Sequence, residues 1–236
     1  MADRAAGSAA AALERLDAIT RRLRRDCPWD REQDERSIVP HTVEEAYELA
    51  DAATSGDDGQ LVDELGDVLF QVHFLSLLLE ERGAGSLAAV ADACREKLVR
   101  RHPHVFGDVE AETASEVRRN WDEIKRTTEG RGGAGLFADV PGNLPSLLYA
   151  RKVLRRAERV GRSADRTAAL EHLKSGFDRL AQPGDGSREE LEATIGETLL
   201  AVVELATAAG VDPELALRAA TKGRERWIDE DVAAHE

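Results

Sequence analysis

Apolar residues recur every three or four positions along almost the whole chain, which is the period of a helix. No segment alternates between apolar and polar residues as a half-buried strand does. Near the N-terminus the pattern predicts an amphipathic helix, with a stripe that consists of Leu13, Leu16, Ile19 and Leu23. Pro28 then interrupts the pattern. We therefore expect an all-α fold without significant sheet.

Capping signals indicate where the next helices begin. Thr42 and Glu45 have the spacing of a capping box, which predicts a second helix from Thr42 to the turn at 56–59. A third helix should follow and end near Gly83. Its expected apolar stripe consists of Leu61, Leu65, Val68, Leu69, Val72 and Leu79.

Further along, a fourth helix is expected over 86–101, before a loop at 102–108. A second capping box, Thr113 with Glu116, then opens a fifth helix. The stretch that follows is rich in glycine and contains two prolines, so it is expected to be a linker. These signals predict a first domain at 1–129, a linker at 130–145 and a second helical-bundle domain at 146–236. In the second domain, Asp212 as N-cap and Pro213 at the first helical position should begin the last helix.

The two halves resemble each other. The sequence LGDVL at 65–69 recurs as IGETL at 195–199, an offset of 130 residues. Lys97 and Arg101 recur as Lys222 and Arg226, at an offset of 125. Internal duplication explains both observations. Chance similarity between helices rich in leucine and alanine is the alternative.

The composition limits the kinds of molecule that the protein is expected to bind. The formal net charge is −14, which disfavours binding to nucleic acids and to anionic membranes. A phosphate site in such a chain needs either a local basic cluster or bound cations. The two cysteines form no CxxC motif, and the N-terminus has no apolar core of signal-peptide length. A reducing cytoplasm is the expected location.

Five acidic residues form the main candidate site. On the second predicted helix, Glu44, Glu45 and Glu48 should face one direction. On the third, Glu64 and Asp67 are three positions apart. Because the connection is short, the two helices should form an antiparallel hairpin that brings these acids together. Clustered carboxylates repel one another unless protons or cations compensate, and oxygen ligands favour Mg²⁺ or Mn²⁺.

Other interpretations compete with the cation site. Acidic residues at helical spacing usually form a solvated face, and Glu45 has a second explanation as a capping residue. A ferritin-like di-iron site is disfavoured, because none of the six histidines has a glutamate three positions before it.

Several motifs in order resemble those of the MazG-type all-α nucleoside triphosphate pyrophosphohydrolases. The segments are CPWDREQ, EEAYE, ELGD, KLVRRHPHVFGD, NWDEIK and LFADVPGNLPSLLYARKVLRRAERVG. The resemblance implies two tandem MazG-like domains, a homodimer, and Mg²⁺-dependent cleavage of nucleoside and deoxynucleoside triphosphates to monophosphate and pyrophosphate. It implies that the metal ligands and catalytic residues are Glu44, Glu45, Glu48, Glu64 and Asp67.

The same resemblance implies substrate contacts outside the acids. Lys97 and Arg101 are expected to contact phosphates, and Trp121 and Lys125 the nucleotide. Alternatively, Lys97 and Arg101 form a solvated helix end that is favoured by the helix dipole. Trp121 has an alternative role in the core.

The second copy departs from the family pattern. At the offset of 130, its counterparts of the five acids are Lys174, Ser175, Asp178, Thr194 and Glu197. It is therefore expected to be degenerate, and the function is expected to depend on the first copy. The expected role is the removal of aberrant or excess nucleotides from the nucleotide pool. The alternatives are a non-catalytic helical interaction or regulatory protein, and a hydrolase specific for one modified nucleotide or an alarmone.

Overall fold

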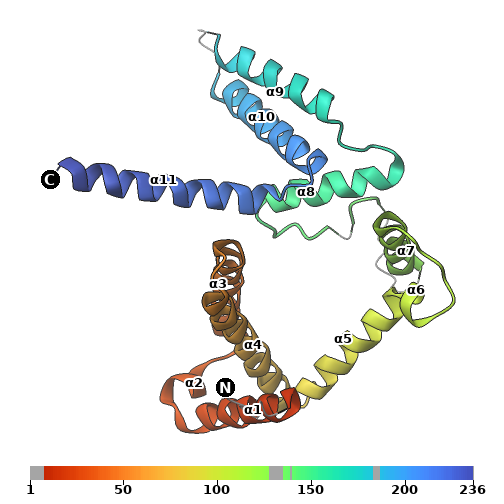
Figure 1. Ribbon diagram of the computed structural model, residues 1–236, viewed down its shortest axis with the longest axis vertical. Helices are drawn as coiled ribbons and strands as arrows, with labels where there is room; N and C mark the ends of the chain where they lie inside the picture. The colour runs from red at the N-terminus through yellow and green to blue at the C-terminus, as the bar shows by residue number, and fades with distance from the viewer. Residues whose placement is uncertain (1–7, 128–134, 139, 183–186, 236) are drawn as a thin grey trace, which may run out of the picture. The chain divides into compact units, whose positions relative to one another are not determined.

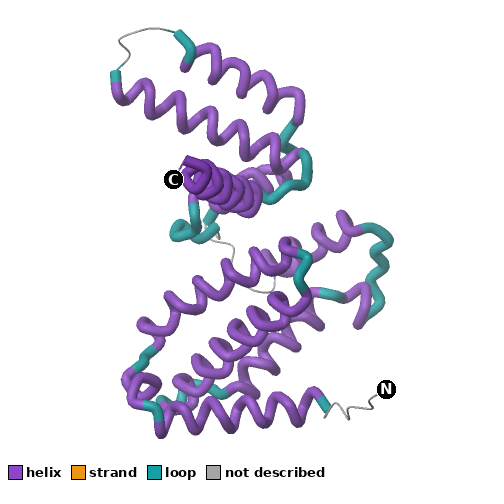
Figure 2. The backbone as a smooth tube through the Cα atoms, turned by 60° about the vertical axis from the view of Figure 1, so that its left-hand side comes forward, coloured by secondary structure: helices purple, strands orange, loops and turns teal. Residues whose placement is uncertain are grey.

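The protein is helical throughout the described part of the chain, which confirms the all-α expectation (Figures 1 and 2). The computed structural model describes residues 8–127, 135–138, 140–182 and 187–235, and no strand occurs among them. The chain forms two compact units, Met1–Arg118 and Arg119–Glu236, which are described separately. The predicted domain limits at 129 and 146 stay predictions.

The first unit contains α1 (Ala9–Asp26), α2 (Pro28–Glu32), α3 (Glu35–Ser55), α4 (Asp58–Glu81), α5 (Leu87–Arg101) and α6 (Pro103–Phe106). The helix α7 (Ala114–Thr127) spans the boundary between the units. Its predicted capping box is confirmed, since the Glu116 amide donates to Thr113 Oγ1 at 3.2 Å. The expected loop at 102–108 was wrong in part, because the chain forms the short helix α6 directly after His102, with Pro103 at its first position.

Helix α3 begins earlier than the sequence suggested. Asp34 is its N-cap and accepts hydrogen bonds from the amides of Arg36 and Ser37, each at 2.8 Å. The Ser37 hydroxyl accepts from the Asp34 amide, which completes a capping box. The prediction of a start at Thr42 was therefore wrong. The earlier cap allows the helix to form before Pro40, and the Thr42 hydroxyl instead donates to the Ile38 carbonyl at 3.3 Å.

Helices α3 and α4 pack as a hairpin, as predicted (Figure 1). Gly56 ends α3 in the left-handed conformation, with φ 79°, which glycine adopts without steric strain. Asp57 then caps α4 by accepting from the amides of Gly59 and Gln60. The core beneath this hairpin consists of Ile38, Phe74 and Leu78, with Phe70 and Leu75 packed against it.

The predicted apolar stripe of α4 is only partly the buried face. Leu65, Leu69 and Val72 are 50%, 38% and 39% exposed, so this part of the stripe is not buried within the chain. The buried face lies further along the helix and includes Phe74, Leu77 and Leu78. The reason is geometric: α3, α1 and α5 are the helices packed on α4 in the described structure, and they leave the earlier stripe uncovered.

The guanidinium of Arg24 joins three elements of the first unit. It forms two hydrogen bonds of 2.8 Å with the Glu81 carboxylate at the end of α4. It also donates to the carbonyls of Asp30 and Gln33, in and just after α2, and lies 5.8 Å from the centre of the Phe74 ring. These contacts hold α1, α2 and α4 together, so the short helix α2 does not depend on its own hydrogen bonds alone.

The second unit contains α8 (Ser146–Ala157), the 3₁₀ helix η1 (Glu158–Val160), α9 (Arg166–Leu180), α10 (Arg188–Ala208) and α11 (Pro213–His235). Helices α9 and α10 pack closely, and α8 and α11 pack on α10. Gly176 permits the approach of α9 to α10, because a Cβ atom there would lie 2.3 Å from Thr198 Oγ1. Asp212 caps α11 through the amides of Glu214 and Leu215, which confirms the predicted start.

Among the described residues, no single helix is long and apolar enough to cross a membrane. Helices α10 and α11 reach that length and composition only when taken together, and they are bent by 108° relative to each other.

Candidate metal centre

The α3–α4 hairpin places its acidic residues in two facing pairs. Counting away from the turn at Gly56, Glu48 on α3 is level with Glu64 on α4, and Glu45 is level with Asp67. The effects on the pKa values agree with this register. Among the neighbouring acids, Asp67 raises the pKa of Glu45 most, and Glu48 raises the pKa of Glu64 most. Acidic residues that are three positions apart on each helix thus form one cluster between the two helices.

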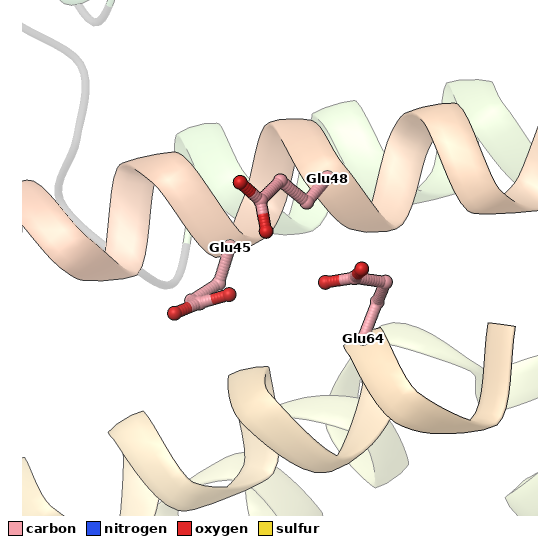
Figure 3. A group of neighbouring side chains, drawn as sticks. All are labelled: Glu45, Glu48 and Glu64. Atoms are coloured by element: carbon pink, nitrogen blue, oxygen red, sulfur yellow. The ribbon is translucent and has the colours of Figure 1, made fainter. Parts of the chain in front are cut away.

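Three of these carboxylates converge. Oxygen atoms of Glu45, Glu48 and Glu64 all lie within 4.8 Å of one another. Figure 3 shows that Glu45 and Glu48 come from one helix and Glu64 from the other, with all three side chains in the space between them. Glu45 and Glu64 are half-buried, whereas Glu48 is exposed.

The surroundings raise the pKa of two of these acids. For Glu45 the main cause is burial, followed by the negative charges of Asp67, Glu48, Glu64 and Glu44. For Glu64 the main cause is again burial, followed by the charges of Glu48, Asp67 and Asp63. Both shifts mean that the ionised form of each side chain is disfavoured, first by burial and then by the neighbouring negative charges.

The donor set fits a hard divalent cation. Glu64 Oε2 is buried and, among the described residues, accepts no hydrogen bond. Within the same part of the chain, no ion pair reaches Glu45, Glu48 or Glu64. An orphaned carboxylate oxygen next to two further carboxylates is the arrangement that a cation such as Mg²⁺ or Mn²⁺ would neutralise with oxygen ligands.

The two remaining predicted ligands lie at the edge of this cluster. Glu44 is exposed, and its Oε2 atom lies 3.1 Å from His41 Nδ1. The His41 ring in turn meets Trp29 edge-on, with ring centres 6.0 Å apart. The contact between His41 and Glu44 was not predicted from the sequence, although their spacing of three on one helix is a signal for it. Asp67 is exposed, and its charge reaches both Glu45 and Glu64.

The predicted substrate contacts lie on other helices. Lys97 and Arg101 are half-buried on α5, which packs on α4 and α6. Arg101 interacts with other groups of the chain. Trp121 is half-buried on α7, in the segment that belongs to the second unit, and the side chain of Lys125 lies outside the described residues. Their contacts with substrate stay predictions.

The second unit holds an ion pair where the first holds clustered acids. Glu197, the counterpart of Asp67, binds Arg179 with an N–O distance of 2.6 Å. Thr194, the counterpart of Glu64, donates its hydroxyl to the Glu190 carbonyl at 2.8 Å. In the second unit an arginine thus compensates the charge of the acidic residue. Among the described residues, the cluster of acids that could hold a metal lies on α3 and α4.

An all-α fold with a carboxylate cluster between two antiparallel helices defines a class of candidate cation-binding helical proteins. Comparison with known proteins identifies the family. Residues 33–106, which contain all five acids, match the MazG nucleotide pyrophosphohydrolase domain. The chain is 37% identical over 230 residues to a nucleoside triphosphate pyrophosphohydrolase of Escherichia coli K12, covering 92% of this chain and 86% of that protein.

A second relative carries a name of the same kind. A Thermotoga maritima protein named nucleoside triphosphate pyrophosphohydrolase/pyrophosphatase MazG is 36% identical over 213 residues, covering 89% of this chain and 81% of that protein. The crystal structure of a MazG-related protein from the same organism shares 26% identity and a TM-score of 0.43, covering 48% of this chain and 98% of that one. The chain belongs to the MazG nucleotide pyrophosphohydrolase family, whose members are hydrolases acting on acid anhydrides.

Proposed function

We propose that the protein hydrolyses nucleoside triphosphates to the monophosphate and pyrophosphate, with Mg²⁺ bound at the α3–α4 hairpin. The observation that supports this most directly is the convergence of Glu45, Glu48 and Glu64 within 4.8 Å, in the segment that matches the family. The relatives that cover most of the chain carry the name of this activity. The proposed physiological role is removal of aberrant or excess nucleotides in the cytoplasm.

The acids of the hairpin would bind the metal and accept a proton from the attacking water. Glu45, Glu48 and Glu64 form the ligand group, with Glu44 and Asp67 at its edge. Bound Mg²⁺ would polarise phosphate oxygens and lower the pKa of a water molecule. A carboxylate outside the three-way cluster is better placed to accept the proton from that water, because its oxygens are not all needed as ligands. Glu44, which His41 orients, and Asp67 are the two such groups.

Substrate binding would draw on basic and aromatic residues outside the hairpin. A triphosphate brought next to clustered carboxylates needs positive charge on its other side. Lys97 and Arg101 are four positions apart on α5, so both can face one ligand. Trp121 and Lys125 on α7 are the proposed contacts of the nucleoside. Support for these four assignments comes from the motif resemblance and from their chemistry.

We also propose that the protein is a homodimer. The apolar residues Val62, Leu65, Leu69 and Val72 recur at helical spacing and form one stripe along α4. Their exposures are 70%, 50%, 38% and 39%, an unusual amount of apolar surface for a helix so close to the core. A second copy of the chain would cover this stripe with its own, as twofold symmetric interfaces do.

A panel of nucleotides tests the proposed reaction. Purified protein would be incubated with ribo- and deoxyribonucleoside triphosphates, modified nucleotides and an alarmone, each with Mg²⁺ and with EDTA. We expect pyrophosphate and monophosphate in equal amounts from ordinary triphosphates, and neither product in EDTA. If the protein hydrolysed only one modified nucleotide, the proposed substrate class would be wrong and that nucleotide would take its place. Absence of turnover across the panel would overturn the proposal and favour a non-catalytic role.

A further inference from the structure

Positive charge accumulates in one short segment of this acidic chain. Residues 146–162 contain six basic residues and a single acidic one, Glu158, although the chain as a whole has a net charge of −14. The segment comprises α8, η1 and the turn at Gly161. Charged residues of mixed sign are typical of a solvated surface, so this concentration of one sign calls for an anionic partner.

The helix presents these charges on its outer side. Helices α10 and α11 pack on α8, and the half-buried residues of α8 include Val153 and Leu154. Tyr149, Lys152 and Arg155 are exposed and follow one another at intervals of three, so they lie along one side of α8. Arg162 is also exposed, just after the end of η1. We call Tyr149, Lys152, Arg155 and Arg162 the α8 basic face.

Other arginines of the segment serve the fold. Arg151 is paired with Asp212, the N-cap of α11, and both side chains are largely buried. Arg156 and Arg159 also interact with groups of the chain. The α8 basic face does not include them, but their charges add to the positive field on this side of the helix.

We propose that the α8 basic face binds a nucleoside triphosphate without a metal, as a site separate from the α3–α4 acids. Lys152, Arg155 and Arg162 would contact the phosphates, and Tyr149, which is 41% exposed, would stack on the base. From Tyr149 to Arg155 the helix rises by roughly 9 Å, which suits a ligand with an aromatic group at one end and phosphates at the other.

Electrostatic range favours a small polyanion over a nucleic acid. At physiological salt, charges act over about 8 Å, so a bound nucleotide would experience mainly the charges of residues 146–162, where six basic residues outnumber the single Glu158. A long strand would extend beyond it and meet the acidic remainder of the chain. The second unit, which lacks the cation ligands of the first, would then act as a nucleotide-sensing unit.

Calorimetric titration of the full-length protein with ATP in EDTA tests the proposal. Without a cation, the α3–α4 acids repel a triphosphate, so binding under these conditions reports on another site. We expect wild-type protein to bind, and binding to weaken strongly between about 0.1 M and 1 M salt, where the Debye length falls from about 10 Å to about 3 Å. The double variants Lys152→Glu/Arg155→Glu and Lys152→Gln/Arg155→Gln should bind at least several-fold more weakly, the first more so.

The matched control is Arg15→Glu/Arg25→Glu, which makes the same change of charge at exposed positions of α1. It should bind as wild type does, and circular dichroism should show all variants folded. Tyr149→Ala should weaken binding of ATP but not of inorganic tripolyphosphate. Absence of binding by wild type, equal losses in the control, or an unchanged ATP affinity in Tyr149→Ala would overturn the proposal. Tighter binding of a single-stranded RNA than of ATP would overturn the choice of ligand. Because the titration needs no turnover, its outcome is independent of the nucleotide panel.

Discussion

Glu48 on α3 and Glu64 on α4 lie level with each other across the hairpin, with oxygen atoms within 4.8 Å. Neither residue has an ion-pair partner within the described part of the chain, and one oxygen of Glu64 is buried without a hydrogen bond. Two facing carboxylates in this state are stable only with protons or a cation between them.

Replacing either residue of the facing pair by its amide should remove activity. We expect Glu48→Gln and Glu64→Gln to lower Mg²⁺-dependent release of pyrophosphate by about 100-fold or more, because both are proposed metal ligands and the loss even of a group that supports such a ligand costs about 10- to 100-fold. The amide keeps the size of the side chain, so the circular dichroism spectrum should not change. Glu197→Gln, at the counterpart of Asp67 in the second unit, is the matched control and should keep nearly full activity. Full activity in both Glu48→Gln and Glu64→Gln would contradict the site assignment.

Mg²⁺ should stabilise the folded protein, because it binds carboxylates that are brought together only on folding. At a concentration 100 times the dissociation constant, a ligand of the folded state adds about 2.7 kcal/mol to the free energy of unfolding. Thermal denaturation with and without Mg²⁺ measures this effect, and Glu45→Gln/Glu64→Gln should abolish it. An equal gain in melting temperature in the double variant would show that the cation binds elsewhere.

The pH dependence of stability without metal should reveal the raised pKa values. Burial and neighbouring charges raise the pKa of Glu45 above its ordinary value of 4.5, so the folded state holds this proton more tightly than the unfolded state does. The resulting stabilisation is fully present below 4.5 and is lost as the pH rises through the raised pKa. In EDTA, wild-type protein should therefore lose stability relative to Glu45→Gln as the pH rises from about 4.5 to neutral. Denaturant unfolding at a series of pH values measures the difference, and parallel curves for the two proteins would contradict it.

The sequence predicted the proximity of acidic residues on the two helices better than it predicted where the first of these helices begins. The spacing of the five acids and the short turn at Gly56 are local features, and both survive in the structure. The start of α3 was predicted too late, because two pairs of residues have the spacing of a capping box. These pairs are Thr42 with Glu45, and Asp34 with Ser37. Pro40 favoured the later one, yet the structure tolerates proline within the second turn of the helix.

Tertiary features were harder to predict. A helical stripe such as Leu65, Leu69 and Val72 indicates an apolar face, but not whether that face meets the chain's own core or another surface. The contacts of Arg24 with Glu81 join residues 57 positions apart, and no local pattern signals them. The ion pair of Glu197 with Arg179 likewise depends on the packing of α9 against α10.

The Arg24 contacts should matter more for stability than an ordinary surface ion pair. The Arg24 side chain is only 17% exposed and binds both Glu81 and the carbonyls near α2. Arg24→Met should lower the free energy of unfolding by about 2 kcal/mol, as expected when a hydrogen-bonded charged group is removed and its acceptors lose their partner. Arg22→Met removes a pair with Asp26 whose side chains are 78% and 62% exposed, and should cost at most about 0.5 kcal/mol. Equal losses in the two variants, measured by urea unfolding, would contradict the role of Arg24.

The exposed stripe of α4 should decide the oligomeric state. If a second copy covers Leu65 and Leu69, a lysine at both positions would place charged groups in an apolar interface and prevent association. Sedimentation velocity should then show a dimer for wild type and a monomer for Leu65→Lys/Leu69→Lys. The control Val105→Lys/Val109→Lys changes two apolar residues of similar exposure, 63% and 46%, that lie outside the stripe, and it should remain dimeric. A wild type that stays monomeric at all concentrations, or a stripe variant that still dimerises, would show that this surface is not the interface. Because Leu65 and Leu69 are already exposed in one copy, their replacement should cost the isolated monomer little stability, which separates loss of association from loss of folding.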